Sequence, residues 1–385
     1  MVNTSLPEAP HHDPPLPTQE QCMLTAMTWF RTLLIDIQQN YLVEYADLAI
    51  IDLAKYATPE GCTELVREVH DAMRTVGFFY VINHGYTPEQ TQRMFDIADI
   101  PFSGVTPEEK ERYLGQMKTT GSYQGYKPRG YWHIEGGVHD QVETYNMHRD
   151  VTRKPHPEAL RPFLPEIAAF TEHNHFNVLY PLLTLVARSL ELSDDALVKL
   201  HTYEAESESY LRMMKYYSRS EEEERRSGGV WFKGHTDFGS MTMLWSQPIA
   251  ALQIRVPDGS WKWIKYIENA IVINTGEAMD FFSGLYYKGT IHRVVQPPID
   301  QRHLTRRSII YFGFAHDDLK LLPLVESPVL QRVGVQRRVA DEEAPTMEEW
   351  RRGRISAYGQ TELKKGAEEG VQVETIKGVE VKHYM

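Results

Sequence analysis

From about Ser207 to residue 320, the sequence consists of short apolar runs that are separated by turn residues. After a first run at 209–217, strands are predicted near 230–236, 240–246, 251–255, 261–266, 270–275, 286–295 and 306–315. Proline- and glycine-containing turns, such as Pro257-Asp258-Gly259, lie between them. Many short strands at close spacing are typical of a β-sandwich or a β-barrel. This stretch therefore limits the fold more than any other part of the chain.

The residues before this stretch predict mainly helices. Three helices are expected to begin with a threonine N-cap followed by proline and glutamate, at Thr58, Thr87 and Thr106. The longest helical pattern runs over residues 165–192, and Pro181 inside it should kink or split the helix. Shorter strands are expected at residues 48–53 and 78–83. Together with the strands after residue 207, these elements predict an α+β protein.

The composition and the hydrophobic pattern of the sequence distinguish four regions. Five prolines in residues 1–21 predict a disordered arm. Residues 22–206 form a region of helices and strands that packs on the barrel, and it begins with an amphipathic helix at 22–40. Residues 207–320 are expected to be the strand-rich core, and the charged run 221–226 is expected to be a solvated hairpin loop. Residues 321–385 are expected to be a peripheral helix, near 346–354, and a charged tail.

Composition and charge exclude several classes of function. The net charge of −12 argues against nucleic-acid binding, which requires a basic face. No run of about 18 apolar residues is present, so no membrane span is expected, and the first 20 residues do not have the pattern of a signal peptide. Two cysteines are too few for a disulfide framework and favour a reducing compartment. We therefore expect a cytoplasmic protein.

Three side chains have the spacing of a metal site. His235 and Asp237 are separated by one residue, so on an extended strand they point to the same face. His292 follows 55 residues after Asp237. Two histidines and one carboxylate on one side of a metal are the ligands of non-haem Fe(II) oxygenases. Arg306 and Ser308 follow in an R-x-S pattern, and such an arginine is a bidentate receptor for a carboxylate.

In this order and at this spacing, these elements resemble those of the 2-oxoglutarate/Fe(II)-dependent dioxygenases. The similarity is to the branch that includes isopenicillin N synthase, and most of all to its fungal members. It implies a double-stranded β-helix (jelly roll) core, Fe(II) held by His235, Asp237 and His292, and 2-oxoglutarate held by Arg306 and Ser308. Tyr217 stands where family members often contribute a third donor, although Lys215 replaces their usual asparagine. By alternation along the strand, Arg307 should face opposite to Arg306, outward.

The resemblance also implies the reaction and the co-substrates. O2 and 2-oxoglutarate would be consumed, with ascorbate in a supporting role, and succinate and CO2 would be released. An unactivated C–H bond of a small organic molecule would be oxidised, by hydroxylation or by the related desaturation and ring closure. A role in secondary metabolism is expected, in a monomer or a weak homodimer that binds neither nucleic acid nor membrane.

The substrate pocket is less defined by the sequence than the metal site. Residues 119–150 are rich in glycine and aromatic residues, and in the resembled family this region folds over the mouth of the metal site. Tyr126, Trp132 and Phe314 are the aromatic residues that we expect to line the pocket. Simple packing of this loop onto the barrel is an equally good interpretation.

Two alternative functions remain open from the sequence. Isopenicillin N synthase and the plant ethylene-forming oxidase use the R-x-S pattern for other carboxylates, so a 2-oxoglutarate-independent iron oxidase of the same fold is one alternative. Formation of succinate coupled to product would separate the two enzymes. The other alternative is a non-catalytic jelly roll that only binds its ligand, and the complete set of three metal ligands argues against it.

Overall fold

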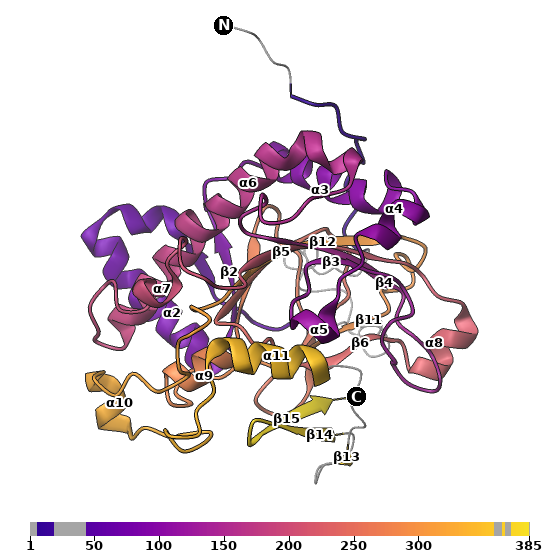
Figure 1. Cartoon of the computed structure of the whole chain (residues 1–385). Coiled ribbons are helices and arrows are strands. Elements are labelled where there is room, and N and C mark those ends of the chain that lie inside the picture. The colour runs from indigo at the N-terminus through magenta and orange to yellow at the C-terminus, as the bar shows by residue number, and fades with distance from the viewer. Residues whose placement is uncertain (1–5, 19–43, 358–363, 366–370, 385) are drawn as a thin grey trace, which may run out of the picture.

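The computed structural model describes residues 6–18, 44–357, 364–365 and 371–384. Two mainly antiparallel sheets face each other in the middle of the molecule, and helices lie outside them (Figure 1). This arrangement confirms the predicted α+β class with a jelly-roll core. The helix expected at 22–40 lies outside the described residues.

The larger sheet has eight strands and contains segments from both halves of the chain. In spatial order its strands are β1 (Ile50–Asp52), β2 (Phe78–Ile82), β10 (Ile271–Thr275), β7 (Met241–Ser246), β12 (Arg306–Gly313), β5 (Tyr210–Tyr216), β4 (Val142–His148) and β3 (Gly125–Lys127). Four of them precede residue 207, so the N-terminal region extends the core sheet as well as packing on it.

The smaller sheet has seven strands and carries two of the predicted metal ligands. In spatial order its strands are β13 (Lys364–Lys365), β14 (Val371–Ile376), β15 (Val379–Tyr384), β6 (Val230–His235), β11 (His292–Val295), β8 (Leu252–Arg255) and β9 (Trp261–Trp263). The strands predicted between residues 230 and 315 are therefore all present, although several are shorter than expected.

The described residues also form helices of very different length. They are α2 (Pro59–Thr75), α3 (Pro88–Ser103), α4 (Pro107–Arg112), α5 (Met117–Thr120), α6 (Leu164–Glu172), α7 (Tyr180–Ser189), α8 (Glu221–Ser227), α9 (Glu277–Phe282), α10 (Pro328–Val333) and α11 (Met347–Ala357). Within the described ranges, none of these helices has both the length and the apolar character needed to cross a membrane.

The predicted helix starts are confirmed by their capping hydrogen bonds. The hydroxyl oxygens of Thr58, Thr87 and Thr106 accept from backbone N–H groups three residues later, at 3.1, 3.3 and 3.2 Å. Each donor is a group that a helix leaves without an internal partner. The long helical segment is interrupted by a π-helical turn, His173–Leu179, and α7 begins directly after it with Pro181 in its first turn. The predicted split at Pro181 is therefore confirmed.

The charged run 221–226 was expected to be a hairpin loop, and that prediction is wrong. These residues form helix α8. The hydroxyl of Ser220 accepts from the backbone N–H of Glu223 at 3.3 Å, and the Glu223 carboxylate accepts from the Ser220 N–H at 3.1 Å. This reciprocal capping box begins the helix, and Gly228 ends it in a left-handed conformation with φ of 61°.

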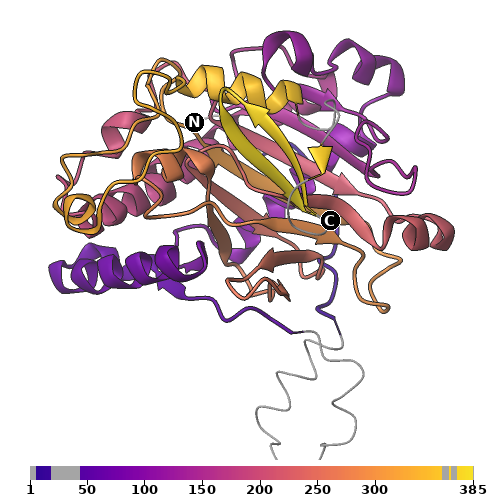
Figure 2. The same cartoon turned by 90° about the horizontal axis from the view of Figure 1, so that it is seen from below.

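The prediction of a peripheral C-terminal tail is wrong for residues 371–384. Strands β14 and β15 form a hairpin, and Tyr384 pairs with Gly234 of β6. The two turn residues, Lys377 and Gly378, have φ of 48° and 77°, as a tight hairpin turn requires. Figure 2 shows this yellow hairpin beside α11, on the side of the smaller sheet. The end of the chain therefore extends the sheet that carries the metal ligands.

The region 119–150 was predicted to be a long loop, and this is only partly correct. Its second half contains strand β4, which pairs with β5 from Val142 to His148. Its first half contains β3, which pairs with β4. Both strands belong to the larger sheet, so they cannot move freely over the mouth of the barrel.

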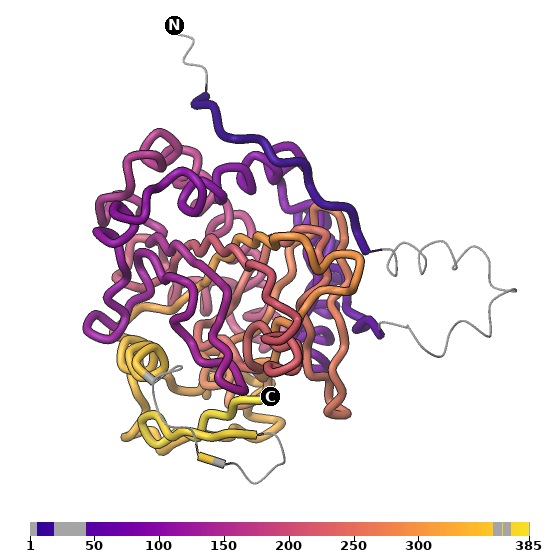
Figure 3. The backbone as a smooth tube through the Cα atoms, turned by 90° about the vertical axis from the view of Figure 1, so that its right-hand side faces the viewer, coloured from indigo at the N-terminus to yellow at the C-terminus, as the bar shows by residue number. Residues whose placement is uncertain are grey.

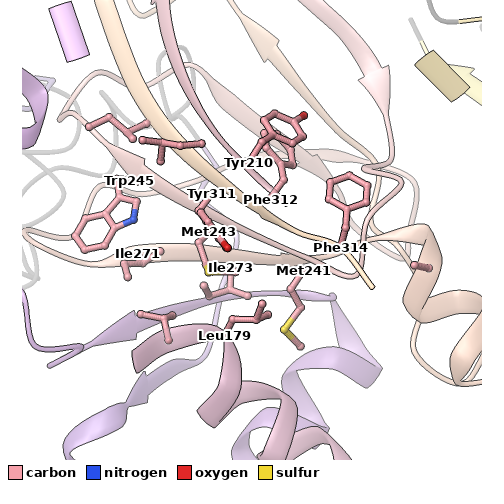
Figure 4. Packing of buried hydrophobic residues seen from close by; sticks show 14 of the residues in the cluster. Leu179, Tyr210, Met241, Met243, Trp245, Ile271, Ile273, Tyr311, Phe312 and Phe314 are labelled. Atoms are coloured by element: carbon pink, nitrogen blue, oxygen red, sulfur yellow. The ribbon is translucent and has the colours of Figure 1, made fainter. Parts of the chain in front are cut away.

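The outer face of the larger sheet packs against the helices and forms the main core (Figure 4). Met243, Trp245, Ile273 and Tyr311 alternate out of the sheet toward Leu179 in the π-helical turn. The opposite face of the same strands is directed at the smaller sheet. Both faces of β5, β7 and β12 are largely buried, so their sequences do not show a simple alternation of apolar and polar residues.

Residues 6–18 have no helix or strand, as their prolines predict, but they lie against the body of the protein (Figure 3). The His11 Nδ1 atom is 2.9 Å from a carboxylate oxygen of Asp96 in α3. The Arg93 guanidinium donates to the Pro7 carbonyl at 2.6 Å, and the Gln301 side chain donates to the Leu16 carbonyl at 2.8 Å. The disordered arm expected for residues 1–21 is thus held by these contacts over its described part.

The buried histidine His175 predicts a dependence of stability on pH. Burial lowers the pKa of His175 to about 3, from 6.5. Between these values the unfolded chain binds one more proton than the folded chain, so the free energy of unfolding falls as the pH falls. The expected loss is about 1.4 kcal/mol per pH unit below 6.5.

Urea unfolding at pH 7.5 and pH 5.5 measures this contribution. His175→Gln should be less stable at both values, because the contacts of His175 with Tyr311 and the His201 carbonyl are lost. From pH 7.5 to pH 5.5, the free energy of unfolding of this variant should decrease by about 1.4 kcal/mol less than that of the unchanged protein. If the free energy of unfolding changes by the same amount between the two pH values in both proteins, the fold does not hold His175 neutral.

Candidate metal centre

His235, Asp237 and His292 come together at one end of the space between the two sheets. His235 ends β6 and His292 begins β11, and the two residues are paired partners across these antiparallel strands. Their ligand atoms and those of Asp237 all lie within 4.8 Å of one another. His235 Nε2 is 3.8 Å from Asp237 Oδ1, and His292 Nε2 is 3.9 Å from Asp237 Oδ2. One ion can therefore contact all three side chains.

Each imidazole is oriented by a backbone carbonyl. The Nδ1 atom of His235 is 2.8 Å from the carbonyl oxygen of Lys233, and that of His292 is 3.1 Å from the carbonyl oxygen of Thr290. A proton on Nδ1 satisfies each contact and leaves the lone pair of Nε2 directed at the common point. Such outer contacts fix the tautomer and the ring orientation of metal-binding histidines.

The carboxylate of Asp237 is fixed by two donors from the larger sheet. Thr242 donates to Oδ2 at 2.7 Å from β7, and Asn274 donates to the same oxygen at 2.8 Å from β10. Burial raises the pKa of Asp237, but His292, His235 and these two donors outweigh burial and lower it overall. Burial also lowers the pKa of His235 to about 3, aided by repulsion from His292. Neutral imidazole and ionised carboxylate are the forms that bind a divalent metal.

Arg306 and Ser308 lie on β12 and face the same space as the three ligands. Arg306 is 3% exposed and Ser308 is 1% exposed. Among the described residues, neither Arg306 Nε nor Ser308 Oγ has a hydrogen-bond partner. Burying such groups without partners is costly, so a ligand that supplies a carboxylate would remove the cost. The residues present thus fit both Fe(II) and a dicarboxylic co-substrate.

These five side chains line one cavity between the two sheets. Its other walls are mainly apolar and come from both sheets. They include Phe78, Leu244 and Ile310 from the larger sheet and Phe232, Leu252 and Val294 from the smaller sheet. An apolar cavity with a few converging polar groups is typical of a small-molecule site.

Tyr217 does not line this cavity, which corrects the sequence prediction. Its hydroxyl donates to Glu143 Oε2 at 3.1 Å, on the other side of the sheet. Tyr216 lines the cavity instead, with its ring 5.2 Å from the Arg306 guanidinium carbon. Side chains alternate along β5, so the pairing of Tyr216 with Arg306 places Tyr216 on the inner face.

The three aromatic residues predicted for the substrate pocket are not among the side chains that line the cavity. The Tyr126 hydroxyl donates to the Pro101 carbonyl at 2.8 Å. Trp132 packs edge-on against Phe232, with ring centroids 5.1 Å apart, and so stands behind a lining residue. Phe314 packs against Phe238 with centroids 5.4 Å apart. Their roles are therefore in packing around the cavity.

Arg307 faces away from the cavity, as alternation predicts, but it does not face solvent. Its Nε atom donates to Asp99 Oδ1 of α3 at 2.7 Å, and Lys215 donates to the same oxygen at 2.8 Å. Helix α3 covers this face of the sheet and supplies the opposite charge. The prediction that Arg307 faces opposite to Arg306, outward from the cavity, is confirmed. Its contact with α3 could not be predicted, because the sequence does not place that helix on this face of the sheet.

A buried ion pair from the C-terminal region supports the loop between His235 and Asp237. Arg354 in α11 donates to Glu277 at 3.1 Å and to the backbone carbonyl of Thr236 at 3.3 Å. The Thr236 hydroxyl also donates to Glu277. The sequence prediction missed this pair. The sequence feature that could have indicated it is Arg354, at the end of the helix that was expected to be peripheral.

Comparisons with known proteins agree with this geometry. Residues 208–315 match a family model for the 2OG-Fe(II) oxygenase superfamily, where 2OG denotes 2-oxoglutarate. Residues 48–166 match a model for the N-terminal region of non-haem dioxygenases, described as "non-haem dioxygenase in morphine synthesis N-terminal". The first match contains all three metal-ligand candidates, Arg306 and Ser308.

Relatives come from fungi and plants. The chain is 30% identical to UPF0676 protein C1494.01 of Schizosaccharomyces pombe over 336 residues, which is 83% of this chain and 95% of that protein. It is 27% identical to jasmonate-induced oxygenase 3 of Arabidopsis thaliana over 306 residues, or 74% of this chain and 77% of that protein. It is 27% identical to the 2-oxoglutarate-dependent dioxygenase tropC of Talaromyces stipitatus over 290 residues, or 71% and 86%.

Solved structures share the fold. A full-length Neurospora crassa protein in complex with alpha-KG superposes with a TM-score of 0.70 at 22% identity, covering 80% of this chain and 96% of that one. The structure of JOX2 in complex with 2OG, Fe and JA gives a TM-score of 0.58 at 22% identity, covering 82% and 88%.

Proposed function

Because the chain belongs to the 2OG-Fe(II) oxygenase superfamily, and is a 2-oxoglutarate-dependent non-haem Fe(II) dioxygenase, we propose that it oxidises an unactivated C–H bond of a small organic molecule. Hydroxylation is the reaction that we propose first, with desaturation and ring formation as variants of the same step. The observation that carries this proposal is the convergence of His235, Asp237 and His292 on one point of an apolar cavity.

We assign Fe(II) to His235, Asp237 and His292, and the co-substrate 2-oxoglutarate to Arg306 and Ser308. The support for the first assignment is the common point of the three ligand atoms. The support for the second is the pair of buried polar atoms without partners on β12. When bound, Fe(II) would supply O2 activation and 2-oxoglutarate would supply two electrons, giving succinate and CO2. One oxygen atom of O2 would enter succinate, and the other would enter the substrate in hydroxylation or leave as water in desaturation and ring formation.

The side chains of this protein then have three tasks. The Lys233 and Thr290 carbonyls hold the two imidazoles, and Thr242 and Asn274 hold the Asp237 carboxylate, so the ligands need no reorganisation when the metal binds. Arg306 fixes one end of the co-substrate. Apolar walls such as Phe78 and Leu252 limit the access of water to the reacting centre.

Secondary metabolism is the setting that we propose for this reaction. The similar proteins include scopoletin 8-hydroxylase of Arabidopsis thaliana, and its name indicates hydroxylation of a small molecule. We further propose that residues 207–320 are the catalytic core, that 22–206 and 321–385 support it, and that the protein acts in the cytoplasm as a monomer or a weak homodimer. The low cysteine content supports a reducing compartment.

The experiment that tests this function measures co-substrate turnover. The Fe(II)-loaded enzyme is incubated with 2-oxoglutarate, O2 and a metabolite panel, and succinate is quantified together with oxidised product. We expect at least one panel member to raise succinate formation above the uncoupled rate and to gain 16 mass units or lose two hydrogens. If Fe(II) and 2-oxoglutarate bind but no panel member is oxidised, oxidation of a small molecule is contradicted.

A further inference from the structure

The cavity contains a second buried arginine that none of the assigned roles uses. Arg212 lies in β5, is 7% exposed, and lines the cavity together with the three metal-ligand candidates. Its Nε atom donates to the side-chain oxygen of Asn146 at 2.6 Å. Its Nη2 atom is buried and has no hydrogen-bond partner among the described residues. Asn146 is neutral, so this hydrogen bond does not balance the charge of Arg212.

The strand register separates Arg212 from Arg306. Arg306 is opposite Tyr216 on the neighbouring strand, whereas Arg212 is opposite Ile310. The two arginines are therefore four positions apart along the paired strands, or about 13 Å. One guanidinium cannot replace the other at the same carboxylate group over that distance. The two cations lie at different ends of the cavity.

The same register places Arg212 at the end where the metal ligands lie. Thr242, which holds the Asp237 carboxylate, is opposite Phe312 on β12. Phe312 is two positions from Ile310, the partner of Arg212, or about 7 Å along the strand. Along the strands, Arg212 thus lies near the three metal-ligand candidates, whereas Arg306 lies farther from them. A substrate that reacts at the metal must occupy the space near Arg212.

The charges of the cavity do not balance without a further anion. Fe(II) and Arg306 together carry three positive charges, and Asp237 with doubly ionised 2-oxoglutarate carries three negative charges. Arg212 adds one positive charge to this neutral set. Burying an uncompensated charge is costly, so an anionic group on the substrate would be favoured at this position.

Aromatic rings hold Arg212 in place and shape the surrounding space. The guanidinium carbon is 4.6 Å from the Tyr123 ring centroid, 5.1 Å from that of Phe312 and 5.4 Å from that of Tyr210. Figure 4 shows Tyr210 and Phe312 side by side, and their rings stack with centroids 4.6 Å apart. These contacts and the bond to Asn146 fix the guanidinium plane, so its free N–H groups are preorganised.

We propose that Arg212 binds a carboxylate group of the substrate, so that the enzyme acts on small carboxylic acids. This inference rests on the proposed function, because it assumes that Fe(II) and 2-oxoglutarate occupy the sites assigned above. The ionised acid would accept hydrogen bonds from the guanidinium, and its hydrocarbon part would lie along the apolar wall toward the metal. A primary amide of the same shape is neutral and would leave the charge of Arg212 uncompensated.

Binding to the anaerobic enzyme loaded with Fe(II) and 2-oxoglutarate tests the proposal. The probes are a panel of aryl- and alkyl-substituted acetic acids, each matched with its primary amide, measured by calorimetry. We expect at least one acid to bind about 10- to 100-fold more tightly than its amide. Arg212→Gln should reduce this preference to about twofold or less, and Arg212→Lys should retain part of it.

A matched control removes a positive charge from the same strand on its other face. Lys215→Gln leaves Asp99 paired with Arg307 and should keep the full preference for acids. The affinity for 2-oxoglutarate should change by less than about threefold in Arg212→Gln, which also shows that the variant is folded.

Three results would overturn the inference. They are a panel in which no acid binds more tightly than its amide, an undiminished preference in Arg212→Gln, and a large loss of 2-oxoglutarate affinity in that variant. The last result would assign Arg212 to the co-substrate instead. Failure of the unchanged protein to bind Fe(II) and 2-oxoglutarate at all would contradict the proposed function, and it is measured first.

Discussion

Replacing His235 with alanine is expected to abolish retention of Fe(II) and to reduce turnover of 2-oxoglutarate to background. The three ligand atoms lie within 4.8 Å of one another, so each would supply one of the three protein ligands that the described residues offer to the metal. Loss of one imidazole leaves a two-ligand site with a buried carboxylate, Asp237. The same result is expected for Asp237→Ala and His292→Ala. Iron content per protein after anaerobic loading and desalting is the measurement.

His303→Ala is the control for the loss of a histidine elsewhere. His303 is exposed and lies between β11 and β12, outside the cavity. This variant should retain one iron per chain. If His235→Ala also retains one iron per chain, His235 is not a metal ligand and the centre must be reassigned.

Replacing Arg306 with alanine is expected to weaken 2-oxoglutarate binding by about two to three orders of magnitude. The substitution leaves one carboxylate of the co-substrate buried without a partner, at a cost of about 3–5 kcal/mol. Iron binding should be unchanged, because Arg306 is not one of the three ligands and lies farther along the barrel. The apparent Kd from an anaerobic titration and the KM for 2-oxoglutarate should rise together.

The neighbouring arginine offers a matched control for this variant. Arg307→Ala removes the same functional group one residue away, but on the face that contacts Asp99. Its affinity for 2-oxoglutarate should stay within about threefold of the unchanged value, while its stability falls because Asp99 loses one of two cationic partners. Equal losses of affinity in both variants would indicate a general effect on folding rather than a direct contact.

The metal-ligand positions could be predicted because the chemistry constrains the spacing. Residues two apart on a strand share a face. Local geometry was therefore enough to predict that His235 lies beside Asp237 and that Arg306 lies beside Ser308. His292 could not be placed beside them by spacing alone. Its position depends on the pairing of β11 with β6, and the order of the elements in a known family supplied that information.

Tyr217 was assigned wrongly because the inner face of β5 cannot be read from its sequence. Both faces of this strand are buried, one against the cavity and one against α3, so hydrophobic alternation is absent. Only the pairing with β12 shows that Arg212 and Tyr216 face inward. The available indication for Arg212 was an arginine between the apolar residues Leu211 and Met213 of a predicted strand, and it was not used in the prediction.

Two other elements that were predicted wrongly, the helix after Ser220 and the C-terminal hairpin, could have been recognised from local sequence patterns. Ser220 and Glu223 form a capping box, a pattern that predicts a helix start, yet the charged run after Ser220 was interpreted as a loop. Lys377-Gly378 separates two runs with alternating apolar residues, which is typical of a hairpin. The contact of β15 with β6, by contrast, joins residues about 150 positions apart in the chain, and no local pattern predicts it.

The most direct test of the central claim is an anaerobic titration of the purified protein with Fe(II) and 2-oxoglutarate, followed by visible absorption. We expect a weak charge-transfer band that saturates at one equivalent of each, is absent in His235→Ala, and requires far more 2-oxoglutarate in Arg306→Ala. A band that is unchanged in both variants, or no band in the unchanged protein, would contradict the assignment of the metal and co-substrate sites.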